Sequence, residues 1–169
     1  MDYLWTPWRY QYLITSGKQE GCVFCAAAQD TDDQRSLIVH RATHNFVILN
    51  RFPYTNGHLM VVPYRHVASL RDLEAEALSE MMLLAQTAEG HLRAIYRPDG
   101  LNFGINLGAS AGAGIAGHLH LHGLPRWMGD ANFMTVVGET RVLPEDLSVT
   151  WQKLRDAFGH AGPGELGSK

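Results

Sequence analysis

The apolar positions of the chain fall into short runs that predict five strands. The runs cover 37–41, 45–51, 58–63, 101–108 and 118–125. The segment "FPYTNG" (52–57) separates the second run from the third, and its Pro and Asn-Gly favour a turn. A β-hairpin is therefore predicted over 45–63. The polar segment "TDDQRS" (31–36) is predicted to be a loop.

Two segments repeat their apolar residues at three- and four-residue steps, the spacing of an amphipathic helix. The longer segment covers 72–96, and its apolar positions are Leu73, Ala77, Met81, Leu84, Ala88, Leu92 and Ile95. The second helix is predicted from about Pro144, which suits a first helical turn. Its apolar positions are Leu147, Trp151, Leu154 and Phe158. One long helix between the third and fourth strands predicts an α+β fold with a mainly antiparallel, five-stranded sheet and a C-terminal helix.

The composition indicates a single globular domain. The 169 residues are 46% apolar and 18% charged, with no internal repeat, so we expect one domain over 1–158 and a disordered tail over 159–169. The net charge of −3 argues against a DNA or RNA duplex as partner. The aromatic N-terminal segment lacks the pattern of a signal peptide, and no apolar run approaches the ~20 residues that span a bilayer. A cytoplasmic protein without membrane contact is expected.

The stretch "GAGIAGHLHLHG" (112–123) combines a glycine pattern with three histidines. Gly112, Gly114 and Gly117 have the G-x-G-x-x-G spacing of a dinucleotide-binding fingerprint, which requires a helix directly afterwards. The residues that follow alternate with period two and end at Gly123 and Pro125. Such a segment is a strand, so the dinucleotide-binding interpretation is rejected.

Period two places His118, His120 and His122 on one face of the strand, and we expect that face to line a cleft or meet solvent. Two chemistries remain open. Neighbouring histidines ~7 Å apart could share a metal, although the first and third are ~13 Å apart. No carboxylate follows before Asp130. Alternatively, a neutral imidazole could attack phosphorus in phosphoryl or nucleotidyl transfer, with glycine-loop N–H groups stabilising the phosphoryl oxygens.

Cys22 and Cys25 form a C-x-x-C pair. In a reducing compartment this spacing favours metal binding or redox activity over a structural disulfide. The redox interpretation would need a strand before the pair and a helix opening on it, and the preceding sequence predicts neither convincingly.

The segment "HLHLHGLP" resembles the His-φ-His-φ-His-φ-φ motif of the histidine triad (HIT) family of nucleotide hydrolases and transferases. The resemblance extends to "FVILNRFPYTNGHLMVVPYRHV" (46–67) and to 106–133, and with "LWTPWR" and the cysteine pair it spans about 3–158. It points to the branch near the diadenosine polyphosphate hydrolases and phosphorylases. It implies a HIT-like fold, a nucleotide or dinucleoside polyphosphate substrate and a homodimer, with Trp5, Trp8 and Trp127 as candidates for the subunit interface or for core packing.

The resemblance also implies roles for individual residues. His120 would attack the α-phosphorus of an adenylyl substrate and form a covalent nucleotidyl-histidine, which water or phosphate then releases. His122 and His58 would support the phosphate and the leaving group, and Asn50 matches the ribose-binding position. The phosphate-binding segment is matched by Asn106 and by the loop containing Ser110, Gly114 and Ile115.

This chain departs from the family pattern in that loop. Familiar members carry Gln or Ser shortly before the triad, where this chain has Ala113 and Gly114. Ser110 or backbone N–H groups would then hold the phosphate.

Some members of the wider superfamily bind a structural zinc through C-x-x-C, a downstream His and the first triad His. The corresponding residues here are Cys22, Cys25, His66 and His118, a chemically sensible Cys₂His₂ set. Two other functions remain possible at this point: a nucleotide-binding or sensing protein with little turnover, and a metalloenzyme that uses the triad as ligands. The sequence does not decide between hydrolysis and phosphorolysis.

Overall fold

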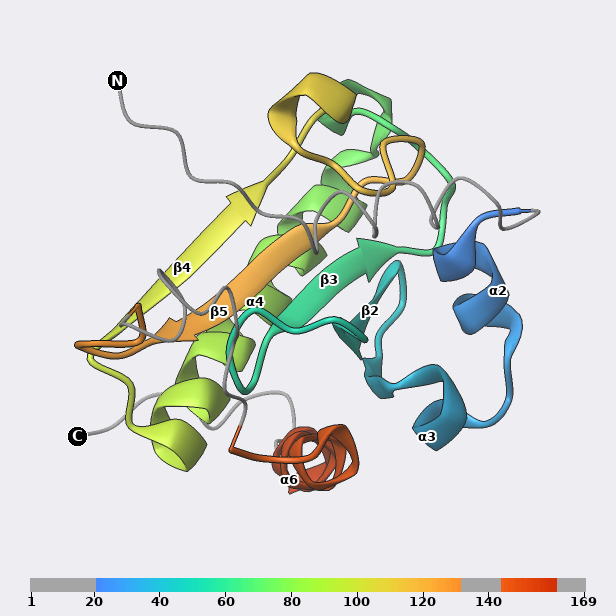
Figure 1. Cartoon of the computed structure of the whole chain (residues 1–169). Helices are drawn as coiled ribbons and strands as arrows, with labels where there is room; N and C mark the ends of the chain where they lie inside the picture. Colours follow the sequence, from blue (N-terminus) through green and yellow to red (C-terminus); the bar gives the residue numbers. More distant parts are fainter. Residues whose placement is uncertain (1–20, 132–143, 161–169) are drawn as a thin grey trace, which may run out of the picture.

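Five strands form one antiparallel sheet in the order β1-β2-β3-β5-β4 (Figure 1). The computed structural model describes residues 21–131 and 144–160. The strands are β1 (Ile38–Arg41), β2 (Asn45–Leu49), β3 (Leu59–Pro63), β4 (Gly100–Ile105) and β5 (Leu121–Arg126). The predicted α+β fold, with a long helix between the third and fourth strands, is confirmed.

The β2–β3 hairpin forms the centre of the sheet. Every residue of both strands is buried, and Phe46 pairs with Val62 while Ile48 pairs with Met60. Gly57 closes the turn with a φ of 77°, a conformation that favours glycine. The hairpin predicted over 45–63 is therefore confirmed.

One face of the sheet packs against α4 (Ala75–Tyr96), which lies behind it in Figure 1. The buried helix positions include Ala77, Met81, Leu84, Ala88 and Leu92, as the apolar stripe predicts. The helix begins three residues later than predicted. Residues 70–72 form a separate 3₁₀ turn, η1 (Leu70–Asp72), and Leu73 is extended.

The C-terminal helix α6 (Leu147–His160) packs Leu154 and Phe158 into the same core. It does not begin at Pro144. Asp146 precedes the helix, and its carboxylate accepts a hydrogen bond from the backbone N–H of Ser148 at 2.8 Å, so a capping carboxylate sets the start. The helix extends two residues beyond the expected domain end at 158, and the rest of the predicted tail lies outside the described residues.

Two short helices, α2 (Val23–Gln29) and α3 (Asp33–Ser36), precede the sheet in the chain. From α2, Phe24 packs against Phe46, Ile48 and Met60 on the face opposite α4. The loop predicted over 31–36 is wrong for its last four residues, which form α3. The Asp32 carboxylate accepts from the Arg35 N–H at 3.1 Å and caps α3.

The histidine segment also differs from its prediction. β5 begins only at Leu121, because Leu119 donates its backbone N–H to the Val67 carbonyl at 2.7 Å instead of joining the sheet ladder. Leu119 and Leu121 do enter the α4-side core. His118 and His120, however, are 1% and 5% exposed, so of the two alternatives given for the histidine face, a cleft or solvent, these two residues exclude solvent. No helix within 21–131 and 144–160 is long and apolar enough to span a membrane.

Candidate functional site

His120 is held by a hydrogen bond to its own chain. Its Nδ1 lies 2.8 Å from the backbone carbonyl oxygen of His118. Because a carbonyl only accepts, Nδ1 must carry the proton, and the Nε2 lone pair is left free. Burial lowers the pKa of His120, which favours the neutral imidazole. The residue therefore has the protonation state of a nucleophile.

His58 and His122 form a hydrogen-bonded pair beside it. The backbone N–H of Tyr54 donates to His58 Nδ1 at 3.2 Å. We therefore assign the proton of His58 to Nε2, from which it donates to His122 Nδ1 at 3.0 Å. His122 then carries its own proton on Nε2. Burial, reinforced by the neighbouring His120, lowers the pKa of His122 to about 4, so at neutral pH it acts as a neutral donor.

His118 faces the cysteine pair. Its Nε2 donates to the Pro63 carbonyl at 2.9 Å, which leaves the Nδ1 lone pair free. That Nδ1 lies 3.2 Å from Cys22 Sγ and 3.6 Å from Cys25 Sγ. His66 Nδ1 lies 3.3 Å from Cys25 Sγ. All four ligand atoms lie within 4.8 Å of one another.

This donor set fits zinc. Around a tetrahedral zinc, a thiolate sulfur and an imidazole nitrogen would be about 3.5 Å apart, given their usual bond lengths. Cys22 directly precedes α2 and Cys25 lies in its first turn, so a three-residue step turns both thiols to one side. Burial raises the pKa of Cys25, as does the nearby Cys22, and a cation would offset that effect. Of the three triad histidines, only His118 belongs to the group of described residues that could hold a metal ion.

The residues expected to bind the nucleotide lie in loops: Asn50 follows β2, Asn106 follows β4, and the others lie in the segment before the triad. Asn50 follows β2; its Oδ1 accepts from the Phe52 N–H at 2.9 Å, and its Nδ2 lies 3.5 Å from His58 Nε2. Asn106 directly follows β4, and the pairing of Ile105 with Leu121 brings it to the level of His120.

The glycine loop begins after Asn106 with the 3₁₀ turn η2 (Ala109–Ala111), which contains the exposed Ser110. Gly108 and Gly112 flank this turn with φ values of 82° and 89°. Gly114 and Ile115 are half-buried, and the Ile115 carbonyl accepts from the His118 N–H at 3.4 Å. The loop therefore leads directly into the first triad histidine.

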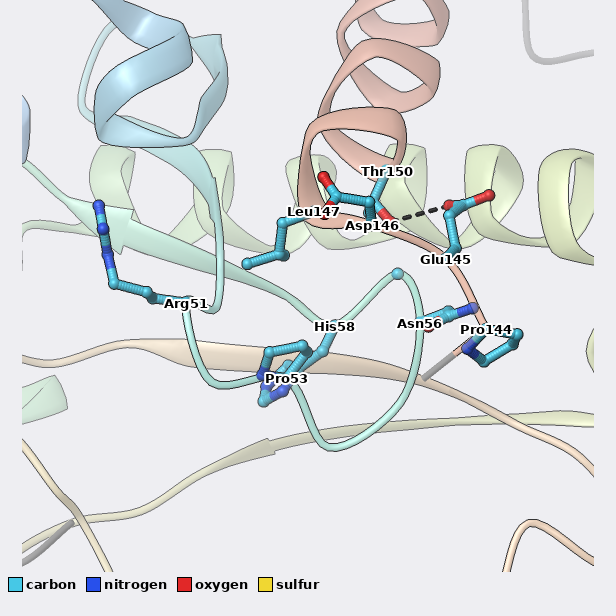
Figure 2. Close-up of a pocket in the computed structure, with 10 residues that line it drawn as sticks. Arg51, Pro53, Asn56, His58, Pro144, Glu145, Asp146, Leu147 and Thr150 are labelled. Carbon is cyan, nitrogen blue, oxygen red and sulfur yellow. Dashed lines mark hydrogen bonds between the residues drawn. The ribbon is translucent and has the colours of Figure 1, made fainter. Parts of the chain in front are cut away.

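A cavity of about 420 Å³ adjoins His58 on another side (Figure 2). It lies between the 51–57 turn and the start of α6, and Glu145 accepts a hydrogen bond from Thr150 in its wall. Neither His120 nor His122 lines it. The cavity is therefore distinct from the histidine cluster, and His58 is the residue they share.

Two contacts of the cluster escaped sequence reasoning. The Phe24 ring packs on both His118 and His120, and Tyr54 stacks on His58 with ring centroids 5.0 Å apart. Phe24 could have been noticed as the aromatic residue inside C-x-x-C. The hydrogen bond from the Tyr54 backbone has no signal in the sequence.

Comparisons with known proteins agree with this geometry. The family described as "HIT domain" matches residues 31–128. An AP-4-A phosphorylase from Mycobacterium tuberculosis is 42% identical over 87% of this chain and 79% of its own length. A bis(5'-adenosyl)-triphosphatase from Dictyostelium discoideum is 33% identical over 55% of this chain and 62% of its own.

A solved structure shares the fold. The crystal structure of a Zn-bound histidine triad family protein from Mycobacterium smegmatis has a TM-score of 0.65 and 30% identity. The match covers 85% of this chain and 95% of that one.

Proposed function

The chain belongs to the HIT domain family, and from this premise we propose that it is an enzyme that cleaves dinucleoside polyphosphates, with diadenosine tetraphosphate as the leading substrate. The observation that carries the proposal is the hydrogen bond from His120 Nδ1 to the His118 carbonyl, which leaves Nε2 as a free base in a buried site. The names of the phosphorylase and triphosphatase relatives support the substrate class.

In the first step, His120 Nε2 attacks the α-phosphorus. The new bond is N–P, the bond from phosphorus to the bridging oxygen breaks, and the oxygen leaves with the rest of the polyphosphate. For diadenosine tetraphosphate the leaving group is ATP, and AMP stays on His120. Backbone N–H groups of the 108–115 loop, with Ser110 and Asn106, would stabilise the phosphoryl oxygens.

His122 would donate its Nε2 hydrogen bond to the phosphate or the leaving oxygen. This role follows from the tautomers assigned above, because Tyr54 fixes the proton of His58 and His58 fixes that of His122. Asn50 would hold the ribose. With a pKa near 4 in the free protein, His122 serves as a hydrogen-bond donor unless the bound phosphates raise that value.

In the second step, phosphate attacks the adenylyl-histidine. A phosphate oxygen bonds to the α-phosphorus, the N–P bond breaks, and ADP leaves while the lone pair returns to His120. We propose phosphate and not water as the acceptor, because a relative that matches over 87% of this chain is named a phosphorylase.

Zinc would occupy the Cys22, Cys25, His66 and His118 cluster, and the Zn-bound relative supports that assignment. When bound, it supplies a structural cross-link between α2 and the histidine segment. The thiols must stay reduced to bind it, which agrees with a cytoplasmic location. We also propose a homodimer formed along β4, because β4 is an edge strand of the sheet and Leu107 beyond it is 46% exposed, whereas α6 contacts the other edge strand, β1.

The test follows the reaction products. The zinc-loaded protein is mixed with diadenosine tetraphosphate and ³²P-phosphate. Equal amounts of ADP and ATP are expected, with label only in the β-phosphate of ADP. Without phosphate, adenylyl-His120 should accumulate and be found by mass spectrometry of the protein.

The control is His120→Asn, which should lose turnover and the adduct but keep the fold and the zinc. Unlabelled AMP and ATP in the presence of phosphate would make the protein a hydrolase. Nucleotide binding without products would favour the sensing function, and full activity in His120→Asn would refute the mechanism.

A further inference from the structure

Of the two residues between the cysteines, Val23 is 36% exposed and Phe24 is 4% exposed. Phe24 lies in the first turn of α2 and packs against Ile38, Phe46, Ile48, Met60 and Val62. The two cysteines flank this buried ring in sequence and turn toward His66 and His118. A cross-link at the cysteines would thus fix the position of Phe24.

The Phe24 ring contacts the histidine segment at two points. Its centroid is 5.4 Å from that of His118, at an interplanar angle of 71°. It is also 5.0 Å from that of His120, at 48°. Edge-to-face and tilted contacts at these separations are favourable for aromatic rings. Phe24 therefore touches both the histidine that faces the cysteines and the one that faces the substrate.

Besides Phe24, a hydrogen bond and one further ring contact bear on the orientation of the His120 imidazole among the described residues. Nδ1 has its hydrogen bond to the His118 carbonyl, and the His122 ring lies 4.7 Å away at 78°. His120 also lies outside the sheet ladder, because β5 starts at the next residue. A ring in this setting depends on a packed neighbour to keep Nε2 aimed in one direction.

The helix that carries Phe24 is weakly stabilised by its own sequence. α2 has seven residues, no side-chain cap at Cys22 and no acidic residue in its first turn. Helices this short are marginal without tertiary contacts. The burial of Phe24 and the cysteine–histidine cluster are the contacts that hold its first turn.

We propose that Phe24 is a positioning residue for His120, whose ring it packs against from the first turn of α2. The inference rests on the proposed role of His120 as nucleophile. Its direct consequence concerns the protein alone: the orientation and tautomer of His120 depend on an aromatic ring at position 24.

The experiment compares Phe24→Leu with Val23→Ala in the zinc-loaded, full-length protein. Leucine keeps an apolar side chain in the cluster but removes the ring, and Val23 is the matched control on the same turn. Three quantities are measured: zinc content, the imidazole ¹⁵N chemical shifts of His120 without substrate, and kcat and KM for diadenosine tetraphosphate with phosphate.

For Phe24→Leu we expect full zinc content and His120 signals that shift from the Nδ1–H tautomer toward a mixture. Its kcat should fall about tenfold or more with little change in KM, because small misplacements of a reacting group are costly. Val23→Ala should match the wild type in all three quantities.

Unchanged His120 signals and kcat in Phe24→Leu would overturn the proposal. Loss of zinc or of the fold in that variant would also overturn it, since Phe24 would then support the metal site rather than His120. If the wild type forms no adenylyl-histidine, the proposed function fails, and the ¹⁵N spectra still decide whether Phe24 orients His120.

Discussion

The side chain of His120 donates from Nδ1 to the backbone carbonyl of His118 at 2.8 Å. His118 faces the cysteine pair with its imidazole. Its backbone carbonyl also orients His120, the proposed nucleophile. Metal binding and catalysis would share this residue without sharing a ligand atom, since His118 Nδ1 faces the thiols and its carbonyl faces His120.

The first prediction concerns His58, which donates to His122 Nδ1 at 3.0 Å. In His58→Leu, His122 loses the donor that fixes its tautomer, and kcat should fall about 10- to 100-fold, as for other supporting partners of site residues. His58→Gln should retain more activity, because its amide N–H can still donate. Steady-state kinetics on both variants provide the check, and wild-type kcat in His58→Leu would contradict the assignment.

The second prediction concerns the cysteine–histidine cluster. Cys22→Ser should lower zinc content after dialysis against a chelator and lower the thermal unfolding midpoint by about 5 °C or more. His120→Asn is the control and should keep its zinc, because its ring lies outside the ligand group. Elemental analysis and calorimetry measure both effects. Zinc loss only in the His120 variant would instead favour a catalytic metal at the triad.

The third prediction is a pH dependence of stability. His40 and His91 both pack on Phe158, at 5.1 and 4.6 Å between ring centroids, and His91 Nε2 is buried without a hydrogen-bond partner among the described residues. Burial lowers the pKa of both histidines, with Arg155 adding to the effect on His40 and His40 to that on His91.

The unfolded chain therefore takes up protons near pH 6.5, before the folded one does, and the free energy of unfolding should fall as the pH drops below about 6.5. His91→Leu should weaken this dependence, whereas Gln86→Ala on the exposed side of α4 should not. Urea unfolding at pH 7.5 and 5.5 measures the difference. An equal loss of stability in wild type and His91→Leu would rule out His91 as a source.

The fourth prediction separates backbone strain from crowding at glycine. Gly57 and Gly129 have similar φ values of 77° and 82°. A Cβ at Gly57 would lie 2.9 Å from Tyr96 Cε2 and 3.0 Å from Leu92 Cδ2, whereas a Cβ at Gly129 meets nothing within 4 Å. Gly129→Ala should cost about 1 kcal/mol for its φ alone, and Gly57→Ala about 1–3 kcal/mol more. Equal unfolding free energies for the two variants would show that the 51–57 turn relaxes.

The fifth prediction tests the proposed dimer. Leu107 follows the edge strand β4 and is 46% exposed, and Val149 on α6 is 45% exposed. Leu107→Lys should shift the protein toward monomer in sedimentation velocity, and Val149→Lys should not, because a charge is disfavoured only in a buried interface. A wild type that sediments as a monomer at all concentrations would exclude the dimer.

The framework of the fold could be predicted from local patterns in the sequence. Alternation and helical spacing are local properties, so the hairpin around Gly57 and the apolar face of α4 could be predicted. The same holds for the candidate residues, because the triad motif and C-x-x-C name them directly. Local signals were weakest where a single side chain decides an element: α3 depends on one carboxylate cap at Asp32, and α6 starts where Asp146 caps it and not at Pro144.

The protonation and orientation of the histidines could not be predicted in the same way. Their protonation depends on partners distant in the chain, since His118 donates to the carbonyl of Pro63 and faces Cys22 across 96 residues. Phe24, which lies in α2 almost a hundred residues earlier in the chain, packs on the rings of His118 and His120. Spacing along a strand gives the side on which a side chain lies. Which atom carries the proton, and what excludes water, is set by contacts that exist only after the strands and helices have packed.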